Sequence, residues 1–389
     1  MKQFYTDLHI HIGRTKSGKP VKITASRSLT LTSIIEYASH QKGLDLIGII
    51  DCHSPEVILE MEDLMKEGRM VELAGGGMYM DNITIILGSE LEIYDSFCKG
   101  PIHVLCYMPT LDSMKEFSSW LSLHMKNITL SSQRTYVSAR ELQNKVKALN
   151  GLFIPAHVFT PFKSLYGSGV KTSLTEVLDP LNIDGIELGL SSDTEMADQI
   201  KELHPYTFLT NSDAHSLEKM AREYQVMEMK EASFLELKKV LHQEDGRKVV
   251  SNYGLDPKLG KYHETVCMKC YSPFSDVEGT CANCGSKKWV KGVAARILEL
   301  KTANILPKRP PYIHQVPLEY IPGLGKKTLE KLLHYFSTEM QIIHEAPYEK
   351  LKELLPVKVA DYIIAARTGD IHFQKGGGGK YGRVEDIIK

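Results

Sequence analysis

The chain has 389 residues, which is long enough for two or three domains, and its 42% hydrophobic and 24% charged residues are typical of a soluble globular protein. Its longest apolar runs, such as Leu46–Ile50 and Ile83–Leu87, are far shorter than the roughly 20 residues of a membrane span, so we expect no membrane association. A strand-like segment begins at Gln3 and leaves no room for a signal peptide, which predicts a cytoplasmic protein with reduced thiols.

The first 250 residues alternate short apolar β-rich runs with amphipathic helical stretches. The predicted strands are, in chain order, Gln3–Leu8, Leu46–Ile50, Ile83–Leu87, Ile102–Cys106, Leu152–Pro155, Gly185–Leu188 and Thr207–Thr210. The predicted helices are Leu29–Lys42, Pro55–Lys66, Leu111–Met125, Ser138–Leu149, Thr194–Glu202 and Ser233–His242. This alternation favours an α/β fold with a mainly parallel sheet, open or closed into a barrel.

Beyond residue 250 the alternation stops. A linker over Asn252–Gly260 leads into a cysteine-rich segment, and a helical region is predicted over 316–366, after Lys308–Pro311. We therefore predict three domains, at residues 1–250, 251–300 and 301–389. Residues 1–254 carry 26 Lys+Arg against 33 Asp+Glu, whereas residues 255–389 carry 21 against 15. The basic C-terminal part suits a polyanionic partner, and uneven solvated surface charge is the alternative explanation.

Histidine or carboxylate residues lie at or near the C-terminal ends of six predicted strands. They are Asp7, His9 and His11, then Asp51 and His53, then Glu90, His103 and His157, and finally Asp213 and His215. Barrels of α/β type build their sites at this edge, and imidazoles and carboxylates are the usual ligands of Zn²⁺, Mn²⁺ and Fe²⁺. A lone histidine is more often a hydrogen-bonded core residue, which is our interpretation of His40, His124 and His204. The combined set instead predicts a multinuclear metal site.

A site of this kind is typical of a phosphoesterase. His9 and His11 are two residues apart on one strand, so both can face the same ion. Glu90 can bridge two ions with its two carboxylate oxygens. Two ions about 3.5–4 Å apart can clamp a phosphodiester and activate water for in-line attack. The metal is open between Zn, Mn, Mg and Fe, because His/carboxylate sites accept several ions.

The motifs at these strand ends resemble those of the PHP (polymerase and histidinol phosphatase) superfamily over residues 1 to about 225. They are Asp7-x-His9-x-His11, Asp51-x-His53, Gly88-x-Glu90, His103, His157 and Ser212-Asp213-Ala214-His215. The resemblance implies a distorted (βα)7 barrel that binds two to three divalent metal ions.

The resemblance also implies roles for individual residues. The first ion would be held by His9, His11, Glu90 and Asp213, the second by Glu90, His103 and His157, and a third by His53 and His215 with a contribution from Asp51. Asp7 would orient a ligand histidine. The third site is the least complete, because Gly13–Ser17 lacks a histidine that some members carry there. Glu90, His157 and Asp213 are the expected catalytic residues.

Three further segments, Pro155–Phe162, Gly189–Asp193 and Asn211–Ser216, resemble the endonuclease Q family, whose members nick DNA on the 5′ side of deaminated bases. In that family a cysteine-type zinc module and a helical region follow the PHP domain, as they do here. The resemblance implies a DNA repair endonuclease that acts 5′ of deaminated or abasic nucleotides, with uracil, hypoxanthine or xanthine as the base. It also implies contacts with other repair or replication proteins.

Three other functions stay open. The first is a small-molecule phosphatase of the histidinol-phosphate type, which would not need the basic segments after residue 254. The second is a DNA exonuclease. The third is a non-catalytic DNA-binding protein with a decayed metal site, against which the nearly complete ligand set argues.

Two C-x-x-C pairs, Cys267/Cys270 and Cys281/Cys284, predict a closed tetrahedral site for one structural zinc ion. A site with four thiolates has no open position, so it folds a small ribbon and does not catalyse. Lys287, Lys288 and Lys291 surround Trp289 directly after it, and this basic cluster is a candidate DNA contact. A solvated ribbon face is the alternative.

The segment Ile321–Thr328 resembles the hairpin of a helix-hairpin-helix DNA-binding motif. Gly323 and Gly325 would let backbone N–H groups approach a phosphate, and Lys326 and Lys327 would add charge. The glycine-rich segment Gly376–Arg383 is either a phosphate-contacting loop or a disordered tail.

The loop Phe159–Gly169 follows the predicted ligand His157 and is the candidate wall of a pocket for a flipped base. Phe162, Lys163 and Tyr166 are its candidate pocket residues. The alternative is a barrel loop that is packed by its own aromatic side chains.

Overall fold

The computed structural model describes the whole chain except residues 261, 275–278, 369–372, 375–382 and 385–389. Most of the predicted glycine-rich segment Gly376–Arg383 therefore lies outside the described residues. Within the described part of the chain, no helix combines the length and apolarity needed to cross a lipid bilayer.

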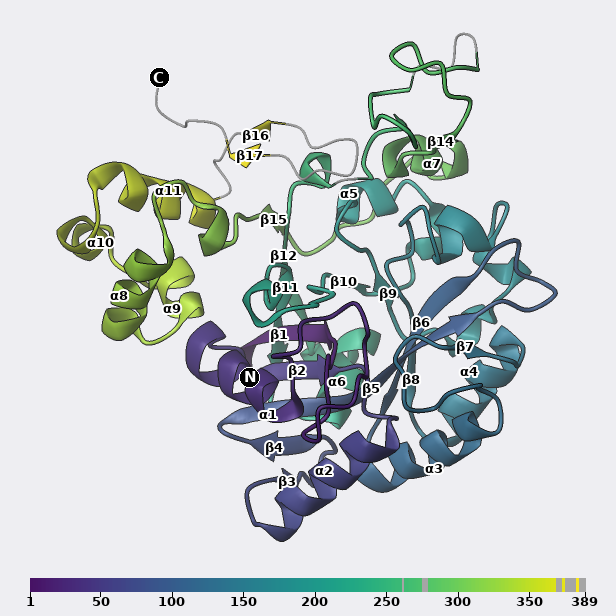
Figure 1. The fold of residues 1–389 in the computed structure, drawn as a ribbon, viewed down its shortest axis with the longest axis horizontal. Helices are drawn as coiled ribbons and strands as arrows, with labels where there is room; N and C mark the ends of the chain where they lie inside the picture. The colour runs from purple at the N-terminus through teal and green to yellow at the C-terminus, as the bar shows by residue number, and fades with distance from the viewer. Residues whose placement is uncertain (261, 275–278, 369–372, 375–382, 385–389) are drawn as a thin grey trace.

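All seven predicted strands are present. They are β1 (Lys2–Ile10), β2 (Leu46–Ile49), β5 (Ile83–Ile93), β6 (Ile102–Met108), β8 (Leu152–Pro155), β9 (Ile186–Glu187) and β10 (Phe208–Leu209). Further strands were not predicted from the sequence: β3 (Val71–Glu72), β4 (Met78–Met80), β7 (Arg134–Thr135), β11 (Tyr224–Met229), β12 (Lys248–Gly254) and β15 (Tyr312–His314). The long strands β11 and β12 continue the sheet beyond β1 (Figure 1).

The sheet is mixed, so the prediction of a mainly parallel sheet is wrong in part. Strands β1, β2 and β5 run parallel, but β6 is antiparallel to both β5 and β8. Only residues 94–101 connect β5 to β6, and a parallel crossover needs a dozen or more residues. The short connection therefore forces β6 to turn back along β5.

Backbone hydrogen bonds continue the strand order from β8 through β9 and β10 back to β1. Phe153 O accepts from Asp184 N at 3.0 Å, and β9 pairs with β10 in parallel. The circuit ends where Ala214 N donates to His9 O at 3.1 Å and His11 N donates to Ala214 O at 3.2 Å. The ends of β1, β2, β5, β8 and β10 and the start of β6 consequently face a common centre.

The six predicted helices of this part are also present. They are α1 (Leu31–Glu36, continued by a π-helix over Tyr37–Lys42), α2 (Pro55–Lys66), α3 (Leu111–Ser122), α4 (Ala139–Ala148), α5 (Thr194–Ala197) and α6 (Phe234–His242). Their apolar faces are buried; in α3, for example, Leu111, Met114, Phe117 and Leu121 are buried. Helices α2, α3 and α4 lie along the outside of the sheet (Figure 1).

The rest of the chain forms a cysteine-containing segment and a group of helices (Figure 1). The former contains β13 (Val266–Cys267) and β14 (Trp289–Val290), followed by α7 (Val293–Leu300). The latter consists of α8 (Lys326–Phe336), α9 (Glu339–His344), α10 (Tyr348–Leu354) and α11 (Val357–Thr368).

Helix α9 fixes the C-terminal helices to the strands. Lys42 Nζ lies 2.8 Å from Glu339 Oε2, and both side chains are buried. The His344 ring stacks on Tyr5 and accepts a 2.6 Å hydrogen bond from the Tyr224 hydroxyl at Nε2. Burial lowers the pKa of His344 to about 4, so the ring stays neutral and can accept this bond.

Candidate metal centre and adjoining cavity

The residues that the sequence singles out meet at the centre of the strand circuit. His9 is the second-last residue of β1 and His11 lies just beyond the strand, Asp51 and His53 follow β2, and Glu90 lies within β5. His157 follows β8, and Asp213 and His215 follow β10. His103 differs from the prediction, because it is the second residue of β6 and not near its end. The antiparallel direction of β6 brings it to the same edge, where it pairs in register with Glu92.

Three groups of side chains could each hold a metal ion. They are His9/His11/Glu90, Glu90/His103/His157 and His11/Asp213/His215, with the ligand atoms of each group within 4.8 Å of one another.

Asp213 Oδ1 lies 3.4 Å from His9 Nε2 and 3.5 Å from His11 Nε2. Ligands at 2.0–2.2 Å in tetrahedral geometry lie about 3.3–3.6 Å apart, so this spacing fits a shared ion. The buried Nε2 atoms of His9 and His11 have no hydrogen-bond partner among the described residues, as expected for ligand atoms. The donor set therefore fits divalent metal ions.

Glu90 lies between two of these groups. Its Oε1 is 2.8 Å from His103 Nδ1 and 3.2 Å from His157 Nε2. Its Oε2 is 3.6 Å from His11 Nε2 and 3.1 Å from the ammonium of Lys22. Oε1 also lies 3.8 Å from His9 Nε2, so the Glu90 carboxylate is within reach of both groups, as a bridging carboxylate would be.

The ionisation state of the two central carboxylates, Asp213 and Glu90, also suits metal ligands. Burial by itself would raise the pKa of Asp213, but the neighbouring imidazoles of His9, His11 and His215 hold it well below its usual range. Burial likewise opposes ionisation of Glu90, and His103 and Lys22 nevertheless keep its pKa well below normal. The buried carboxylate of Glu90 and the partly exposed carboxylate of Asp213 are therefore both ionised, as ligands of a divalent ion must be.

Only one of the two histidines expected at a third metal site lies in a candidate ligand group. His215 joins His11 and Asp213, whereas His53 is in none of the three groups. The His53 ring is fully buried, and both its nitrogens lack a hydrogen-bond partner among the described residues. Asp51 Oδ2 lies 3.1 Å from His11 Nδ1, so Asp51 orients a ligand ring.

Asp7 does not orient a histidine ring as the resemblance implied. Its carboxylate accepts backbone N–H groups of His9, Ser212 and Ala221 instead. These bonds cross from β1 to the segment that carries Asp213. Asp7 therefore holds the position of that segment.

Glu187 orients the ring of His9, a role that was not anticipated from the sequence. Its buried Oε1 accepts from His9 Nδ1 at 2.9 Å and from the Asn211 amide at 2.8 Å. Its Oε2 accepts from the backbone N–H of His157 at 2.8 Å. A carboxylate in the apolar run Ile186–Leu188 was the available signal, since it repeats the pattern of the other strand ends.

Substitution of Glu187 by glutamine is expected to weaken metal binding by about 10- to 100-fold, because residues that orient metal-bound histidines typically contribute this much. Competition with a chromogenic chelator measures the affinity. Glu195→Gln, at an exposed position of α5, is the matched control. An affinity equal to that of the control would show that Glu187 does not position the ligands.

Two residues of the centre have left-handed backbone conformations, His157 with φ 34° and Asp213 with φ 45°. Such strain persists only where the surroundings impose it. The Glu187 carboxylate holds the His157 N–H, and Arg222 donates to the carbonyls of Ser212 and Asp213. The backbone is thus fixed on both sides of the centre.

A cavity of about 410 Å³ opens beside this centre. Its walls are His157, Thr160, Glu187, Gly189, Leu190, Ser191, Asn211, Asp213, His215, Lys219, Arg222 and Tyr262. It is large enough for a small organic group such as a nucleoside. Tyr262, from beyond the last strand of the barrel part, was not anticipated, because only the folded chain brings it there.

The predicted pocket residues Phe162, Lys163 and Tyr166 do not line this cavity. Tyr166 is fully buried, stacks on Phe159 and donates to Glu202, so its assignment to a pocket wall is wrong. Lys163 pairs with Glu92 at 2.8 Å. Phe162 is half exposed and packs edge-on against Tyr262, 5.8 Å between ring centroids.

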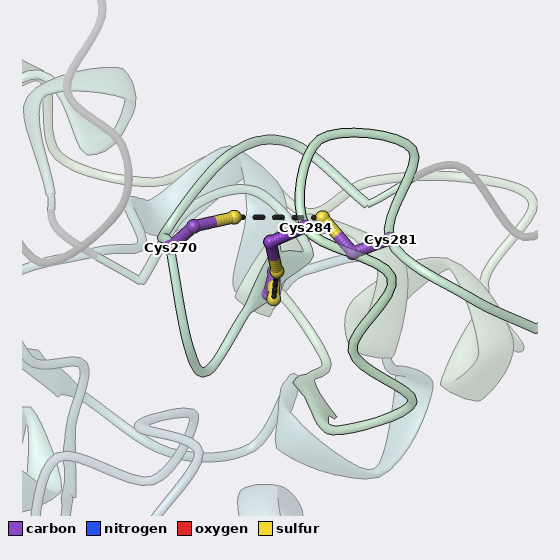
Figure 2. A group of neighbouring side chains, drawn as sticks. Cys270, Cys281 and Cys284 are labelled. Atoms are coloured by element: carbon purple, nitrogen blue, oxygen red, sulfur yellow. Dashed lines mark hydrogen bonds between the residues drawn. The ribbon is translucent and has the colours of Figure 1, made fainter.

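The four cysteines Cys267, Cys270, Cys281 and Cys284 form one group whose sulfur atoms lie within 4.8 Å of one another. Cys267 Sγ is 3.6 Å from Cys284 Sγ, and Cys270 Sγ is 3.5 Å from Cys281 Sγ (Figure 2). Ligands of a tetrahedral zinc ion at Zn–S 2.3 Å lie about 3.8 Å apart, so the group fits zinc. Hydrogen bonds from Ser272 lower the pKa of Cys270 to about 5, which favours the thiolate.

The basic residues next to this group differ in exposure. Lys287 and Lys288 are exposed, whereas Lys291 pairs with Glu299 at 2.5 Å. Trp289 stacks on Phe274, with ring centroids 5.8 Å apart. Two free charges therefore remain on this face.

The predicted hairpin precedes α8. Gly323 has φ 85°, which other residues rarely adopt, and Gly325 is the N-cap of α8. Lys326 and Lys327 are the first two residues of the helix and are exposed. The turn therefore presents backbone N–H groups and two ammonium groups at one helix end.

The chain is similar over its whole length to one curated protein and to two solved structures of endonuclease Q. It is 54% identical over 386 residues to the uncharacterized protein YqxK of Bacillus subtilis (strain 168), covering 99% of this chain and all of YqxK. It matches the lesion-specific endonuclease PfuEndoQ of Pyrococcus furiosus with a TM-score of 0.86 and 33% identity, covering all of this chain and 97% of the other. It matches endonuclease Q in complex with a 27-mer duplex carrying an abasic lesion with a TM-score of 0.85 and 33% identity, covering all of this chain and 98% of the other. No protein-family model matches the sequence.

Proposed function

The chain belongs to the endonuclease Q family, and from this premise we propose that it is a metal-dependent DNA repair endonuclease. It hydrolyses the phosphodiester on the 5′ side of a deaminated or abasic nucleotide, with uracil, hypoxanthine or xanthine as the deaminated base. The observation that carries the proposal is the set of three ligand groups beside a cavity of about 410 Å³. The ligand groups suit a phosphodiester, and the cavity suits one extruded nucleotide.

The circuit β1–β2–β5–β6–β8–β9–β10 is interpreted as the distorted (βα)7 barrel of the PHP superfamily. Its backbone hydrogen bonds close on β1 through Ala214, which supports this interpretation. Residues 1–250 form the barrel domain, residues 251–300 the zinc module, and residues 301–389 a helical DNA-binding domain with a helix-hairpin-helix-like turn. The group of four cysteines and helices α8–α11 support this division.

Two to three divalent ions, Zn, Mn, Mg or Fe, bind the barrel centre, and one structural zinc binds the cysteines. His9, His11, Glu90 and Asp213 hold the first barrel ion, and Glu90, His103 and His157 hold the second. His215, with His53 and Asp51 nearby, completes a third position. Bound ions supply Lewis-acid polarisation of the phosphodiester and a lowered pKa of the attacking water.

The side chains around the centre prepare it for this chemistry. Glu187 and Asp51 each fix a ligand imidazole through Nδ1, so that Nε2 points to the centre. Glu90 keeps the two groups together. The strained backbones of His157 and Asp213 are pre-positioned, so no reorganisation is needed when the substrate binds.

DNA contacts beyond the centre come from the basic C-terminal part. Lys287, Lys288 and Lys291 contact the backbone beside the zinc module. Gly323, Gly325, Lys326 and Lys327 bind a phosphate at the start of α8, where N–H groups point outward. The base enters the cavity next to Ser191, Asn211 and Tyr262.

The test is a nicking assay with labelled duplexes that contain one uracil, hypoxanthine or abasic site, in the presence of Mn²⁺, Mg²⁺ or Zn²⁺. The expected product is a single nick 5′ of the lesion, with an undamaged duplex of the same sequence left intact. Hydrolysis confined to small phosphomonoesters would overturn the proposal in favour of a phosphatase. Stepwise release of nucleotides from an end would overturn it in favour of an exonuclease.

A further inference from the structure

The segment Arg14–Arg27, here called the basic loop, concentrates positive charge in an acidic part of the chain. It contains five cations, Arg14, Lys16, Lys19, Lys22 and Arg27, and no acidic residue. Residues 1–254 as a whole carry 26 Lys+Arg against 33 Asp+Glu. The concentration of charge therefore reflects this loop and not the composition around it.

The basic loop is wrapped around the metal centre. Arg14 is three residues after His11, so their Cα atoms are separated by at most about 11 Å. Lys22 Nζ reaches Glu90 Oε2 at 3.1 Å, and Ser26 N donates to the carbonyl of His215 at 2.8 Å. The loop thus contacts residues of the centre at Lys22 and Ser26, and it begins three residues after His11.

The loop is held in one conformation by the rest of the chain. Val21 N donates to Gly13 O at 3.0 Å, and Lys22 N donates to Ile12 O at 2.9 Å. Ser131 N donates to Val21 O at 2.9 Å from a distant segment. The backbone of the loop around Val21 and Lys22 is consequently held next to the segments that carry the centre.

The cations other than Lys22 face outward. Lys16, Lys19 and Arg27 are exposed and Arg14 is half-buried. Arg14, Lys16 and Arg27, with Thr15, Gly18 and Thr30, line a concave surface of about 460 Å³. Lys19 pairs with Glu56, but no ion pair among the described residues includes Arg14, Lys16 or Arg27. These three charges are available to a partner.

We propose that the basic loop binds the phosphate backbone of the strand that is cut, within about three nucleotides of the scissile bond. This inference rests on the proposed function. It assigns DNA contacts to the N-terminal part of the chain, in addition to those proposed for the zinc module and for the start of α8. A separation of about 11 Å corresponds to about three steps of 3.4 Å along a DNA strand. Cations without an ion pair around a concave surface suit consecutive phosphates, because each neutralised phosphate releases a condensed counterion.

The test compares two double variants of the full-length protein. Lys16→Ala with Arg27→Ala removes two charges from the basic loop without touching Lys22 or the ligands. Lys66→Ala with Arg69→Ala removes one lysine and one arginine from the exposed far end of α2 and is the matched control. Single-turnover nicking of an abasic duplex over a range of enzyme concentrations separates the half-saturating concentration from the maximal rate.

The loop variant is expected to raise the half-saturating concentration about ten- to thirtyfold at 0.15 M salt, with the maximal rate within twofold of wild type. The slope of log affinity against log salt concentration should be smaller in magnitude by about two units than that of the wild type. Each of the two removed cations would otherwise neutralise one phosphate. The control variant should match the wild type in both quantities. Metal content and melting temperature check that the variants keep the fold.

Failure of this proposal is distinct from failure of the proposed function. If the wild type nicks lesion duplexes but the loop variant and the control have the same half-saturating concentration and salt slope, the basic loop does not bind the backbone. A lower maximal rate at unchanged half-saturation would also overturn it, since the loop would then act on the chemical step. If the wild type nicks no DNA at all, the proposed function itself is wrong.

Discussion

Replacement of Asp213 by asparagine is expected to lower the nicking rate at an abasic site by about 10³-fold or more. Asp213 Oδ1 lies 3.4 Å from His9 Nε2, 3.5 Å from His11 Nε2 and 3.3 Å from His215 Nε2, so one oxygen is common to three imidazoles. Asparagine keeps the size of the side chain and removes the charge, and loss of one preorganised electrostatic contact in an active site typically costs 10²–10³-fold. Single-turnover nicking measures the rate, and bound metal per chain should fall in parallel.

The Asp213→Asn substitution separates the effect of the lost charge from any effect on folding. Asp213 has φ 45°, a left-handed conformation that asparagine tolerates well, so the variant should fold normally. Asp245→Asn is the control, because Asp245 also has a left-handed backbone, φ 49°, and lies on the exposed surface. If the Asp213 variant kept more than a tenth of the wild-type rate with full metal content, Asp213 would not be a ligand whose charge matters.

The metal centre was the most predictable part of the molecule. The C-terminal ends of the predicted strands were expected to meet at one edge, so residues such as His9, Glu90 and His157 could be grouped from their positions in the sequence alone. His103 was grouped correctly for the wrong reason. It starts an antiparallel strand, and the short connection 94–101 was the sequence signal for that reversal.

Contacts between distant segments were the part that the sequence could not predict. Glu187 acts through hydrogen bonds to His9 and to the backbone of His157, and neither partner is close to it in sequence. The cavity wall includes Tyr262, which joins it only because α7 is anchored nearby. Tyr166 was misassigned because an aromatic residue in a loop gives no sign in the sequence of whether it points outward or into the core.

The docking of the C-terminal helices also depends on contacts between residues far apart in the sequence. The helices could be predicted from their apolar spacing, but the buried pair Lys42–Glu339 could not, since a lysine after a helix is normally exposed. Removing one partner of such a pair leaves an unpaired buried charge, so it fixes where α9 lies. This contact places the hairpin of α8 in a defined position relative to the barrel part.

Substitution of Cys281 by serine should have the second-largest effect, and it should act on substrate binding. Among the described residues of segment 262–291, the apolar core is small and consists of Phe274 packed with Cys267 and Cys281, with Cys270 and Cys284 against it. A structural zinc ion supplies most of the folding free energy of such a small unit. We expect the variant to lose one zinc ion per chain and to become sensitive to proteases within this segment.

Unfolding of the cysteine segment should also affect the cavity, because hydrogen bonds connect the two. Val293 N at the start of α7 donates to Tyr262 O, and Arg296 donates to the carbonyls of Tyr166, Val170 and Lys171 in the barrel part. The Arg296 bonds hold α7 in place without zinc, but Tyr262 and the exposed Lys287 and Lys288 depend on the folded segment. The half-saturating concentration for an abasic duplex should therefore rise about tenfold or more, because fewer phosphates are neutralised.

A comparison with Cys98→Ser makes this result specific, because Cys98 is a buried cysteine outside the four-cysteine group. The control should keep its zinc, its resistance to protease and its affinity for the lesion duplex. The maximal single-turnover rate of the Cys281 variant should stay within a few-fold of wild type, because the four cysteines form a group separate from the three candidate ligand groups of the centre. Loss of the maximal rate with unchanged half-saturation would instead mean that the cysteine segment supports the chemistry of the barrel centre and not the binding of DNA.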